Sequence, residues 1–357
     1  MKTLKGTTLI LKNDDIKKIL TMCPCIEAVE EAFRELALGV AKNLPRARIY
    51  TPAGAESENL YWFNNLAGAV PKLDAMGLRI DSRITREVMV GGKKRKEFLK
   101  DSTIGMILLF RISTGELLAI LDDPYLSPLR VGATSAVALK YLARRNSSTI
   151  GLIGSGDQAS AQLRGAAAVV SNLKKIKVFS TNPEHRDKFI ETMRGEINAE
   201  MTGVDSSRAA VEGSDIVICA TNSSEPVFDG HWLEEGATVV SIVGGDHTLK
   251  RREIDDVVLE RSRSLFVNSL SQIILDEQAT LFDPMRKEVK RKEVISEIGD
   301  LLIGKSDGRV DDRDIVTYHN NCGMGIQFAA VGAVAYREAV AAGVGRALPA
   351  EWFATSF

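Results

Sequence analysis

A short apolar run followed at once by a glycine-rich segment constrains the fold of this chain more than any other feature. Residues 149–153 read as a buried strand, and Gly154-Ser155-Gly156-Asp157-Gln158-Ala159 follows directly. A helix of small residues is expected up to about Val170, and residues 176–180 form the next apolar run. This order of strand, glycine turn, helix and strand is typical of a βαβ dinucleotide-binding unit.

The glycine segment fits that interpretation residue by residue. Gly154 allows the tight turn, Gly156 lets the backbone approach a pyrophosphate, and Ala159 keeps the helix close to the strand. The amides of the helix then point toward the phosphate charge. An ordinary turn is the alternative, but both the strand and the helix are present. We therefore expect the following residues to bind the cofactor: Gly154, Ser155, Gly156, Asp157, Gln158 and Ala159.

The end of the second strand indicates which nicotinamide cofactor is expected. NAD-binding units usually carry Asp or Glu about 20 residues past the glycines, where it holds the ribose 2′-hydroxyl. This chain has Ser180, Thr181 and Asn182 there, and Arg186 one helical turn later. Hydroxyl, amide and guanidinium donors would accept a 2′-phosphate, so we expect NADP(H), with NAD(H) as the alternative. Asn182 would also cap the helix that opens at Pro183.

The rest of the chain indicates an α/β fold. Beyond the βαβ unit, apolar runs at 200–204, 214–220, 237–243 and 264–268 alternate with helical pieces. This alternation predicts a Rossmann-type, doubly wound parallel sheet. The first third reads as mostly sheet preceded by a helix, and residues 325–342 read as one long helix. At 357 residues the chain exceeds one typical domain, so two domains are expected.

Composition excludes several classes of function. The formal net charge is −1, and the basic run Lys93-Lys94-Arg95-Lys96 beside Gly91-Gly92 reads as a hairpin tip, so no nucleic-acid partner is expected. No apolar segment approaches the ~20 residues of a membrane span, and the N-terminal apolar run is too short for a signal peptide. The four cysteines make neither a disulfide framework nor a metal set. We expect a cytoplasmic protein that binds no metal.

Three arginines are candidates for binding a carboxylate. Arg130 is expected in the first turn of a helix that Ser127 caps and Pro128 opens. A cation is disfavoured there by about 0.3–1 kcal/mol unless an anion binds beside it. Arg46 and Arg79 lie on predicted strands and could reach the same cleft. The planar guanidinium suits bidentate carboxylate capture, although each arginine taken singly is more typical of a surface ion-pair residue.

Asp246 is the candidate acid/base. It follows Val243-Gly244-Gly245 after a predicted strand, at the carboxyl edge where ligands bind open α/β sheets. A carboxylate there could stabilise an iminium cation and exchange protons with it. The alternative is a turn aspartate after a glycine pair. Thr221, Val243 and Gly244 lie at the same expected edge, and we count them among the cofactor-binding residues.

The chain resembles the ornithine cyclodeaminase/mu-crystallin family along nearly its whole length. The landmarks that carry the resemblance, in order, are Pro45-Arg46, Gly77-Leu78-Arg79, Thr114-Gly115-Glu116, Leu126-Ser127-Pro128-Leu129-Arg130, the glycine segment, Val243-Gly244-Gly245-Asp246 and Ile298-Gly299-Asp300. The resemblance implies a homodimer. Residues 1–127 and 319–357 would form a substrate-binding and dimerisation domain, and residues 128–318 would form the Rossmann domain.

The resemblance also implies a small α-imino or α-amino acid as substrate. In the family, arginines matching Arg46 and Arg130, with a lysine where Arg79 stands, hold its carboxylate, and the aspartate matching Asp246 is the catalytic acid/base of the cyclodeaminases. We therefore take Asp246 and Arg79 as catalytic candidates. Two departures matter: Arg79 cannot be deprotonated and so cannot act as a base, and Val131 replaces a threonine.

These departures favour one activity over two alternatives. We expect an NAD(P)H-dependent oxidoreductase acting on the C=N or C–N bond of a small imino or amino acid, as an imine reductase or amino-acid dehydrogenase. One alternative is an ammonia-releasing amino-acid cyclodeaminase that recycles bound NAD. The other is a non-catalytic NADPH-dependent binding protein of the mu-crystallin type.

Overall fold

The computed structural model describes residues 6–55, 57–90, 93–99, 103–246, 250–287 and 294–354. Within these residues the chain divides into two compact units. The first contains the described residues of 6–21, 38–127 and 323–354, and the second contains those of 22–37 and 128–322. Residues 22–37 thus group with the second unit, whereas we expected them in the first.

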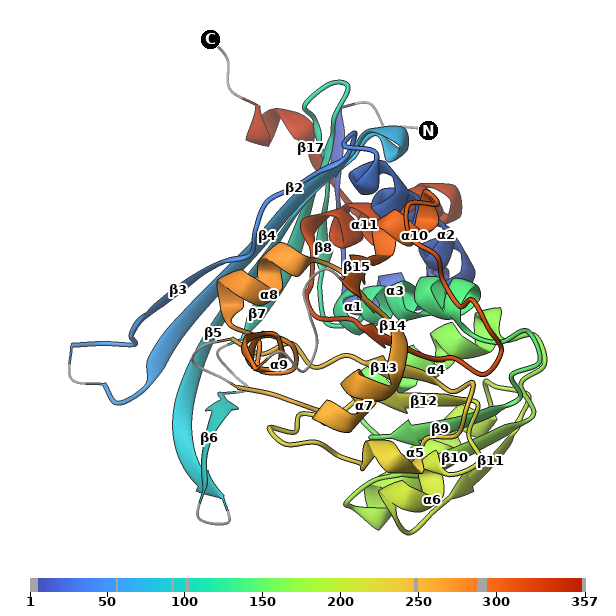
Figure 1. Cartoon of the computed structure of the whole chain (residues 1–357). Helices are drawn as coiled ribbons and strands as arrows, with labels where there is room; N and C mark the ends of the chain where they lie inside the picture. Colours follow the sequence, from blue (N-terminus) through green and yellow to red (C-terminus); the bar gives the residue numbers. More distant parts are fainter. Residues whose placement is uncertain are drawn as a thin grey trace. The chain divides into compact units, whose positions relative to one another are not determined.

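The first unit is a mainly antiparallel sheet. Its strand order is β17-β1-β8-β7-β5-β4-β2, with β3 paired to β4 and β6 paired to β5, and only β1 and β8 run parallel among these pairs (Figure 1). The turn expected between β5 and β6, at Gly91-Gly92, lies outside the described residues. The strands are β1 (Thr7–Leu11), β2 (Lys42–Asn43), β3 (Ala47–Pro52), β4 (Leu60–Val70), β5 (Ala75–Val90), β6 (Lys93–Phe98), β7 (Ile104–Arg111), β8 (Leu117–Asp122) and β17 (Arg346–Pro349).

Helix α11 (Gly325–Ala342) packs on one face of this sheet, and its bounds are those expected from the sequence. Glycine makes the close approach feasible, because a side chain at Gly77 on β5 would meet the Ala329 backbone nitrogen at 2.6 Å. Successive side chains of a strand alternate between faces. Arg79, Asp81 and Arg83 of β5 therefore share the face that carries α11. The smaller helices of the unit are α1 (Asn13–Ile19), η1 (Pro71–Leu73) and η5 (Ala350–Phe353).

The second unit is built on a parallel sheet, as predicted. Its order is β11-β10-β9-β12-β13-β16-β14-β15, and each of these neighbouring pairs is parallel. The first five strands follow the doubly wound order 3-2-1-4-5, so the order reverses between β9 and β12. The strands are β9 (Thr149–Ile153), β10 (Lys175–Phe179), β11 (Glu200–Gly203), β12 (Ile216–Cys219), β13 (Thr238–Ser241), β14 (Ser262–Val267), β15 (Ile295–Glu297) and β16 (Ile315–His319).

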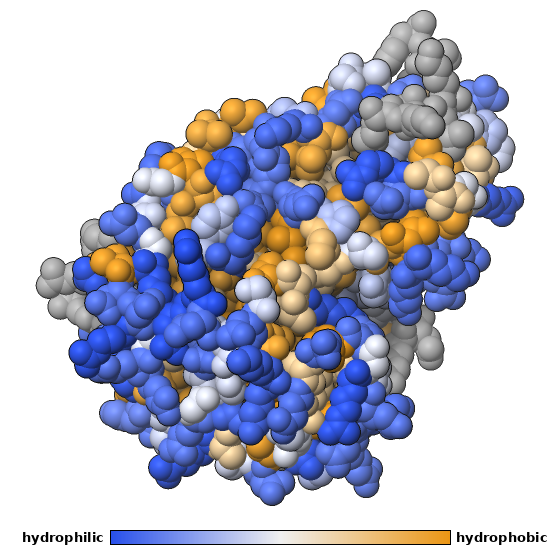
Figure 2. All heavy atoms as spheres, turned by 90° about the vertical axis from the view of Figure 1, so that its right-hand side faces the viewer, coloured by the Kyte–Doolittle hydropathy of each residue, from blue (hydrophilic) through white to orange (hydrophobic). Residues whose placement is uncertain are grey.

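The second unit also contains helices, several of which lie beside its sheet in Figure 1. They are α2 (Met22–Ala37), α3 (Leu126–Leu142), α4 (Asp157–Val169), α5 (Pro183–Arg194), α6 (Ser207–Val211), η3 (Gly230–Trp232), α7 (Asp256–Arg261), α8 (Leu270–Asp276), α9 (Phe282–Arg286) and α10 (Ile298–Leu302). The core is aliphatic, because the fully buried strand residues include Leu152, Val217, Val239 and Val316. The side of the unit formed by α4, β10 and β11 is mainly hydrophilic (Figure 2). Every helix in the described part of the chain is too short or too polar to span a bilayer.

The structure corrects three local expectations. Helix α3 begins at Leu126, so Ser127 is not its N-cap and Arg130 is its fifth residue. Strand β13 runs from Thr238 to Ser241 and is shorter than the expected 237–243, so Val243 lies with Asp246 in the loop beyond it. Strand β16, which contains His319, was not predicted at all, although it lies between β13 and β14.

Candidate functional site

The glycine turn lies where β9 ends and α4 begins. Gly154 has a φ of +121°, which disfavours any residue with a side chain, and a Cβ there would collide with the carbonyl oxygen of Ala220. Gly156 is the N-cap of α4, and a Cβ built on it meets no atom within 4 Å. The turn therefore leaves open space beside the first amides of a 13-residue helix, the position where such a fold receives a phosphate group.

The glycine turn contacts the end of β10. The hydroxyl of Ser155 donates a hydrogen bond to the hydroxyl of Ser180 at 3.0 Å, and the backbone N–H of Asn182 points to the same Ser180 oxygen at 3.4 Å. The Asn182 side chain accepts from the His185 amide at 3.0 Å, which confirms the expected cap of α5. The two segments expected to bind the cofactor thus meet, and no carboxylate stands at positions 180–182.

Arg186 is already engaged by its own surroundings. Its Nε lies 2.8 Å from an oxygen of Asp187, and Nη1 donates to the Val204 carbonyl at 2.9 Å and lies 3.3 Å from Asp205. Hydrogen bonding to Asp187 is the largest cause of a raised pKa for Arg186. The guanidinium therefore carries a charge that two carboxylates partly compensate.

A buried carboxylate holds the two loops that follow β12 and β13. Glu253 is fully buried and accepts hydrogen bonds at 2.6 Å from the N–H and 2.8 Å from the hydroxyl of Thr221. It also accepts from the Ser241 hydroxyl and the Ile242 and Val243 amides, at 2.9, 2.9 and 3.1 Å. Thr221 and Val243 were expected at this edge, whereas Glu253 was missed.

Asp246 lies a few residues beyond these loops. It is 7% exposed, and its neighbour Gly244 packs against the carbonyl oxygen of Asn321. Burial lowers the pKa of Arg251, while the charges of Glu253 and Asp246 oppose that change, so the three groups interact electrostatically. The candidate acid therefore belongs to the same edge of the same sheet as the glycine turn.

Arg79 of the first unit is held by two carboxylates. Its Nη1 lies 3.0 Å from Asp81, and its Nη2 and Nε lie 2.6 and 3.1 Å from one oxygen of Asp123. The guanidinium is also 5.5 Å from the ring centroid of Phe328. Burial opposes its charge, but Asp123 and Asp81 raise the pKa of Arg79 above its ordinary value. Arg79 is a permanent cation, so it cannot be a base.

Arg46 belongs to the same unit as Arg79 and lies just before β3. Strand β3 begins at Ala47, opposite Asn65 of β4, and Leu66 of β4 is opposite Arg79 of β5. Strand β4 therefore lies between the strand that follows Arg46 and the strand that carries Arg79.

Arg130 belongs to the second unit. The charge of Arg130 opposes the large rise in pKa that burial imposes on the Tyr318 hydroxyl. The Asn320 amide anchors this part of α3, because it donates to the Val131 carbonyl at 3.1 Å and to the Ser135 hydroxyl at 3.0 Å. Two of the three expected arginines therefore belong to the first unit, and the third belongs to the second.

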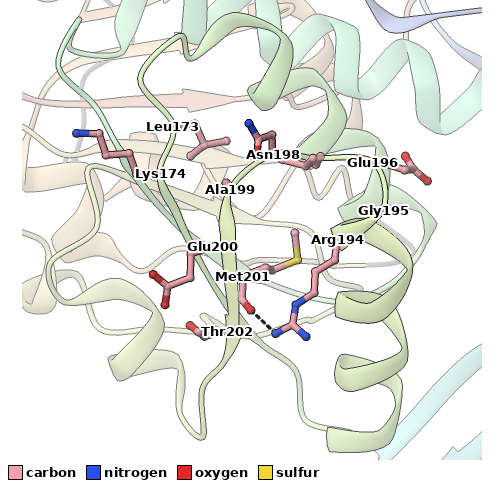
Figure 3. Close-up of a pocket in the computed structure, with 11 residues that line it drawn as sticks. Leu173, Lys174, Arg194, Gly195, Glu196, Asn198, Ala199, Glu200, Met201 and Thr202 are labelled. Atoms are coloured by element: carbon pink, nitrogen blue, oxygen red, sulfur yellow. Dashed lines mark hydrogen bonds between the residues drawn. The ribbon is translucent and has the colours of Figure 1, made fainter.

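A surface pocket of about 930 Å³ lies at the opposite edge of the parallel sheet (Figure 3). It is lined by residues at the amino ends of β10 and β11, among them Lys174 and Glu200, and by the end of α5. Arg194 crosses it and donates to the Met201 carbonyl at 2.7 Å. None of its lining residues is a predicted site residue. In the described part of the chain no group of three or more His, Cys, Asp or Glu is arranged to hold a metal.

Several known proteins are similar over almost the whole chain. The alanine dehydrogenase of Archaeoglobus fulgidus is 30% identical over 355 residues, covering 95% of this chain and 97% of that protein. The structure of Thermococcus litoralis Δ1-pyrroline-2-carboxylate reductase with NADH and L-proline has a TM-score of 0.81 at 30% identity, covering 95% and 99%. An archaeal alanine dehydrogenase dimer with bound NAD has a TM-score of 0.77 at 26% identity, covering 96% and 99%.

The family model agrees with these pairwise similarities. The model of the ornithine cyclodeaminase/mu-crystallin family matches residues 7–343, which include the glycine turn, Asp246 and all three candidate arginines. This chain belongs to the ornithine cyclodeaminase/mu-crystallin family.

Proposed function

We propose that this protein is a nicotinamide-dependent oxidoreductase that reduces the C=N bond of a small α-imino acid, or oxidises the matching amino acid. The observation that carries the proposal is the placement of a buried carboxyl group, Asp246, at the same sheet edge as an open glycine turn. The similar alanine dehydrogenase and pyrroline-2-carboxylate reductase, both oxidoreductases on imino or amino acids, support the same class.

The residues of the second unit fit a dinucleotide. The open side of Gly156 leaves room for a pyrophosphate beside the first amides of α4. Ser180 at the end of β10 suits the adenosine ribose, and Thr221, Val243 and Gly244 line the other half of the edge. When bound, the nicotinamide supplies or accepts the hydride. The chain's own part is to orient the dinucleotide and to supply charge and protons.

Asp246 is the proposed acid/base. The imine nitrogen must be protonated as the bond is reduced, and a carboxyl group within reach supplies that proton and balances the iminium charge. Arg46, Arg79 and Arg130 are proposed to hold the substrate carboxylate. Arg79 uses three donor atoms on Asp81 and Asp123, which leaves one N–H on each terminal nitrogen for a bidentate contact.

NADP(H) is the proposed cofactor in preference to NAD(H). No carboxylate stands at positions 180–182 to repel a 2′-phosphate. The preference rests on this feature and not on Arg186, which Asp187 and Asp205 already engage. Thr181→Asp should therefore increase the ratio of KM for NADPH to KM for NADH by 10-fold or more, and an unchanged ratio would contradict the assignment.

The protein is proposed to act as a homodimer. The sheet face of the first unit that points away from α11 carries apolar side chains that remain partly exposed, including Leu78, Ile80, Leu108 and the 56% exposed Ile104. A second copy would cover them, and a similar alanine dehydrogenase is a dimer. Analytical ultracentrifugation of the wild type should give a dimer, and Leu108→Arg should give a folded monomer. A monomeric wild type would exclude the proposed homodimer.

Absorbance at the reduced-nicotinamide band tests the activity. Purified protein is mixed with NADPH or NADH and with cyclic imino acids, or with 2-oxo acids plus ammonia or methylamine. The proposal predicts stoichiometric oxidation of the cofactor and formation of the amino acid. Ammonia release from ornithine or lysine, with cofactor in catalytic amount only, would instead identify a cyclodeaminase. Cofactor binding without any turnover would identify a binding protein.

A further inference from the structure

The strand order separates the two halves of the bound dinucleotide. In the proposed function the pyrophosphate lies at the glycine turn after β9, and the adenosine ribose lies at Ser180 after β10. β10 is on one side of β9, and β12 and β13 are on the other. The nicotinamide half therefore extends over the loops that follow β12 and β13. These are the loops that Glu253 holds.

Glu253 joins these loops through both of its oxygens. Oε1 accepts two hydrogen bonds from Thr221, after β12, and Oε2 accepts three from Ser241, Ile242 and Val243, at the end of β13. Three of the five donors are backbone N–H groups, which can only donate. The carboxylate form of Glu253, which has no proton of its own, can accept all five hydrogen bonds. Burial raises the pKa of Glu253, and the hydrogen bonds from Thr221, Ile242 and Ser241 oppose that rise.

The cluster around Glu253 extends to a third strand. Ser241, which donates to Glu253, is also 3.2 Å from Nδ1 of His319, at the end of β16. His319 is fully buried, and burial lowers its pKa to about 4, so it is neutral at ordinary pH. The carboxyl ends of β12, β13 and β16 are thus tied to one carboxylate.

We propose that Glu253 is a positioning residue that fixes the nicotinamide-binding half of the site and leaves the adenosine half unaffected. It does not touch the reacting atoms itself. It sets the spacing and direction of the Thr221 and Val243 backbone, on which the nicotinamide half rests. This inference depends on the proposed cofactor function. It assigns the two halves of the dinucleotide to different structures: the glycine turn binds the adenosine and pyrophosphate half, and the loops held by Glu253 bind the nicotinamide half.

The same sheet supplies a matched control at its opposite edge. Asp215, just before β12, accepts from the Ser148 and Thr149 amides at 2.8 and 3.0 Å and pairs with Arg144. Asp215 therefore ties strand ends together as Glu253 does, but at the amino edge. Asp215→Asn should reduce stability through the same kind of loss without changing cofactor affinity.

Titration calorimetry on the full-length protein tests the inference with two probes. The probes are the tighter-binding of NADH and NADPH, and adenosine 5′-diphosphate, which lacks the nicotinamide half. Glu253→Gln keeps the size of the side chain but turns an amide toward donors. Because hydrogen bonds to a charged group are the strong ones, it should raise the Kd of the dinucleotide about 10-fold or more. The Kd of adenosine 5′-diphosphate should stay within about 2-fold, and Asp215→Asn should change neither.

The outcomes separate the inference from the function. If the wild type binds neither dinucleotide, the proposed function fails. If it binds and folded Glu253→Gln weakens both probes equally, or neither, the positioning role is overturned while the function stands. If Glu253→Gln fails to fold, Ser241→Ala replaces it as the test variant, because it removes only one of the hydrogen bonds to Glu253. It should weaken the dinucleotide about 3- to 10-fold with the diphosphate unchanged, and equal effects on both would overturn the role.

Discussion

A carboxylate holds strand ends together at each edge of the parallel sheet, but the two carboxylates differ in their surroundings. At the amino edge, Asp215 accepts two backbone amides and pairs with Arg144, so its charge is compensated within the fold. At the carboxyl edge, Glu253 accepts five hydrogen bonds and is fully buried, with the buried Asp246 in the loop beyond. Both carboxylates hold strand ends together, but only one lies beside an open glycine turn.

The difference follows from the direction of the chain. In a parallel α/β sheet the N-termini of the helices lie at the carboxyl edge, and their free amides attract anions. A buried carboxylate needs hydrogen-bond donors because an unsatisfied buried charge is costly, and at this edge loop amides supply them to Glu253. The surface pocket of about 930 Å³ lies at the amino edge, and its lining residues include no helix N-terminus and no candidate residue. The candidate residues of this unit therefore lie where strand direction places the helix N-termini, and the pocket contains none of them.

Substituting Asp246 should produce the largest difference between the edges. Asp246→Asn keeps the shape but cannot exchange a proton, so kcat for imine reduction should fall about 10³-fold, or about 4 kcal/mol. Asp215→Asn at the amino edge should change kcat less than about 3-fold. Stopped-flow measurement at saturating cofactor gives both values. A kcat for Asp246→Asn within 10-fold of wild type would remove Asp246 from the chemistry.

Alanine substitutions at two glycines of the carboxyl edge should change the free energy of unfolding by very different amounts. Gly154→Ala places a Cβ at φ +121° against the Ala220 carbonyl, and it should lower the free energy of unfolding by about 3 kcal/mol or more. Gly156→Ala enters open space, so stability should change by less than about 0.5 kcal/mol. Urea denaturation without cofactor measures the free energy of unfolding of each variant. Both variants should weaken cofactor binding, and equal stability for the two would contradict the strained turn.

The sequence predicted the features that local signals encode. The strand, turn and helix around Gly154 are contiguous, and α11 runs from Gly325 to Ala342 as expected, because glycines mark both of its ends. The cap at Asn182 is likewise a contact within four residues. In each case the residues that make the structure are neighbours in the chain.

Features that depend on distant partners were not predicted. Glu253 meets Thr221 across 32 residues, and Arg79 meets Asp123 across 44, and nothing in the local pattern marks either carboxylate. Strand β16 was missed because Thr317 and His319 look polar. Both are fully buried, and Thr317 is hydrogen-bonded to Ser262, 55 residues away. The roles of Asp246 and the three arginines remain predictions, since they depend on ligands.

The buried histidine of the carboxyl edge should make stability depend on pH. The folded pKa of His319, about 4, is below the unfolded value of about 6.5. The contribution of neutral His319 to the free energy of unfolding is present above pH 6.5 and is lost as the pH falls from 6.5 through 4. In that range the unfolded chain binds a proton at His319 that the folded chain does not bind. Between pH 7 and pH 5 the loss should be roughly 2 kcal/mol. His319→Asn should flatten this part of the urea-measured profile, and Asp215→Asn should keep it; an unchanged slope in His319→Asn contradicts the assignment.

The amino-edge pocket should give the smallest effect. Arg194→Ala removes the hydrogen bond to the Met201 carbonyl, which joins the end of α5 to the edge strand β11. The bond is partly exposed to water, so the free energy of unfolding should fall by only about 0.5–1.5 kcal/mol. Cofactor Kd and kcat should remain within about 2-fold, because no candidate residue lies there. If Arg194→Ala changed cofactor affinity more than Gly156→Ala does, ligand binding would not be confined to the carboxyl edge, and the contrast between the two edges would no longer hold.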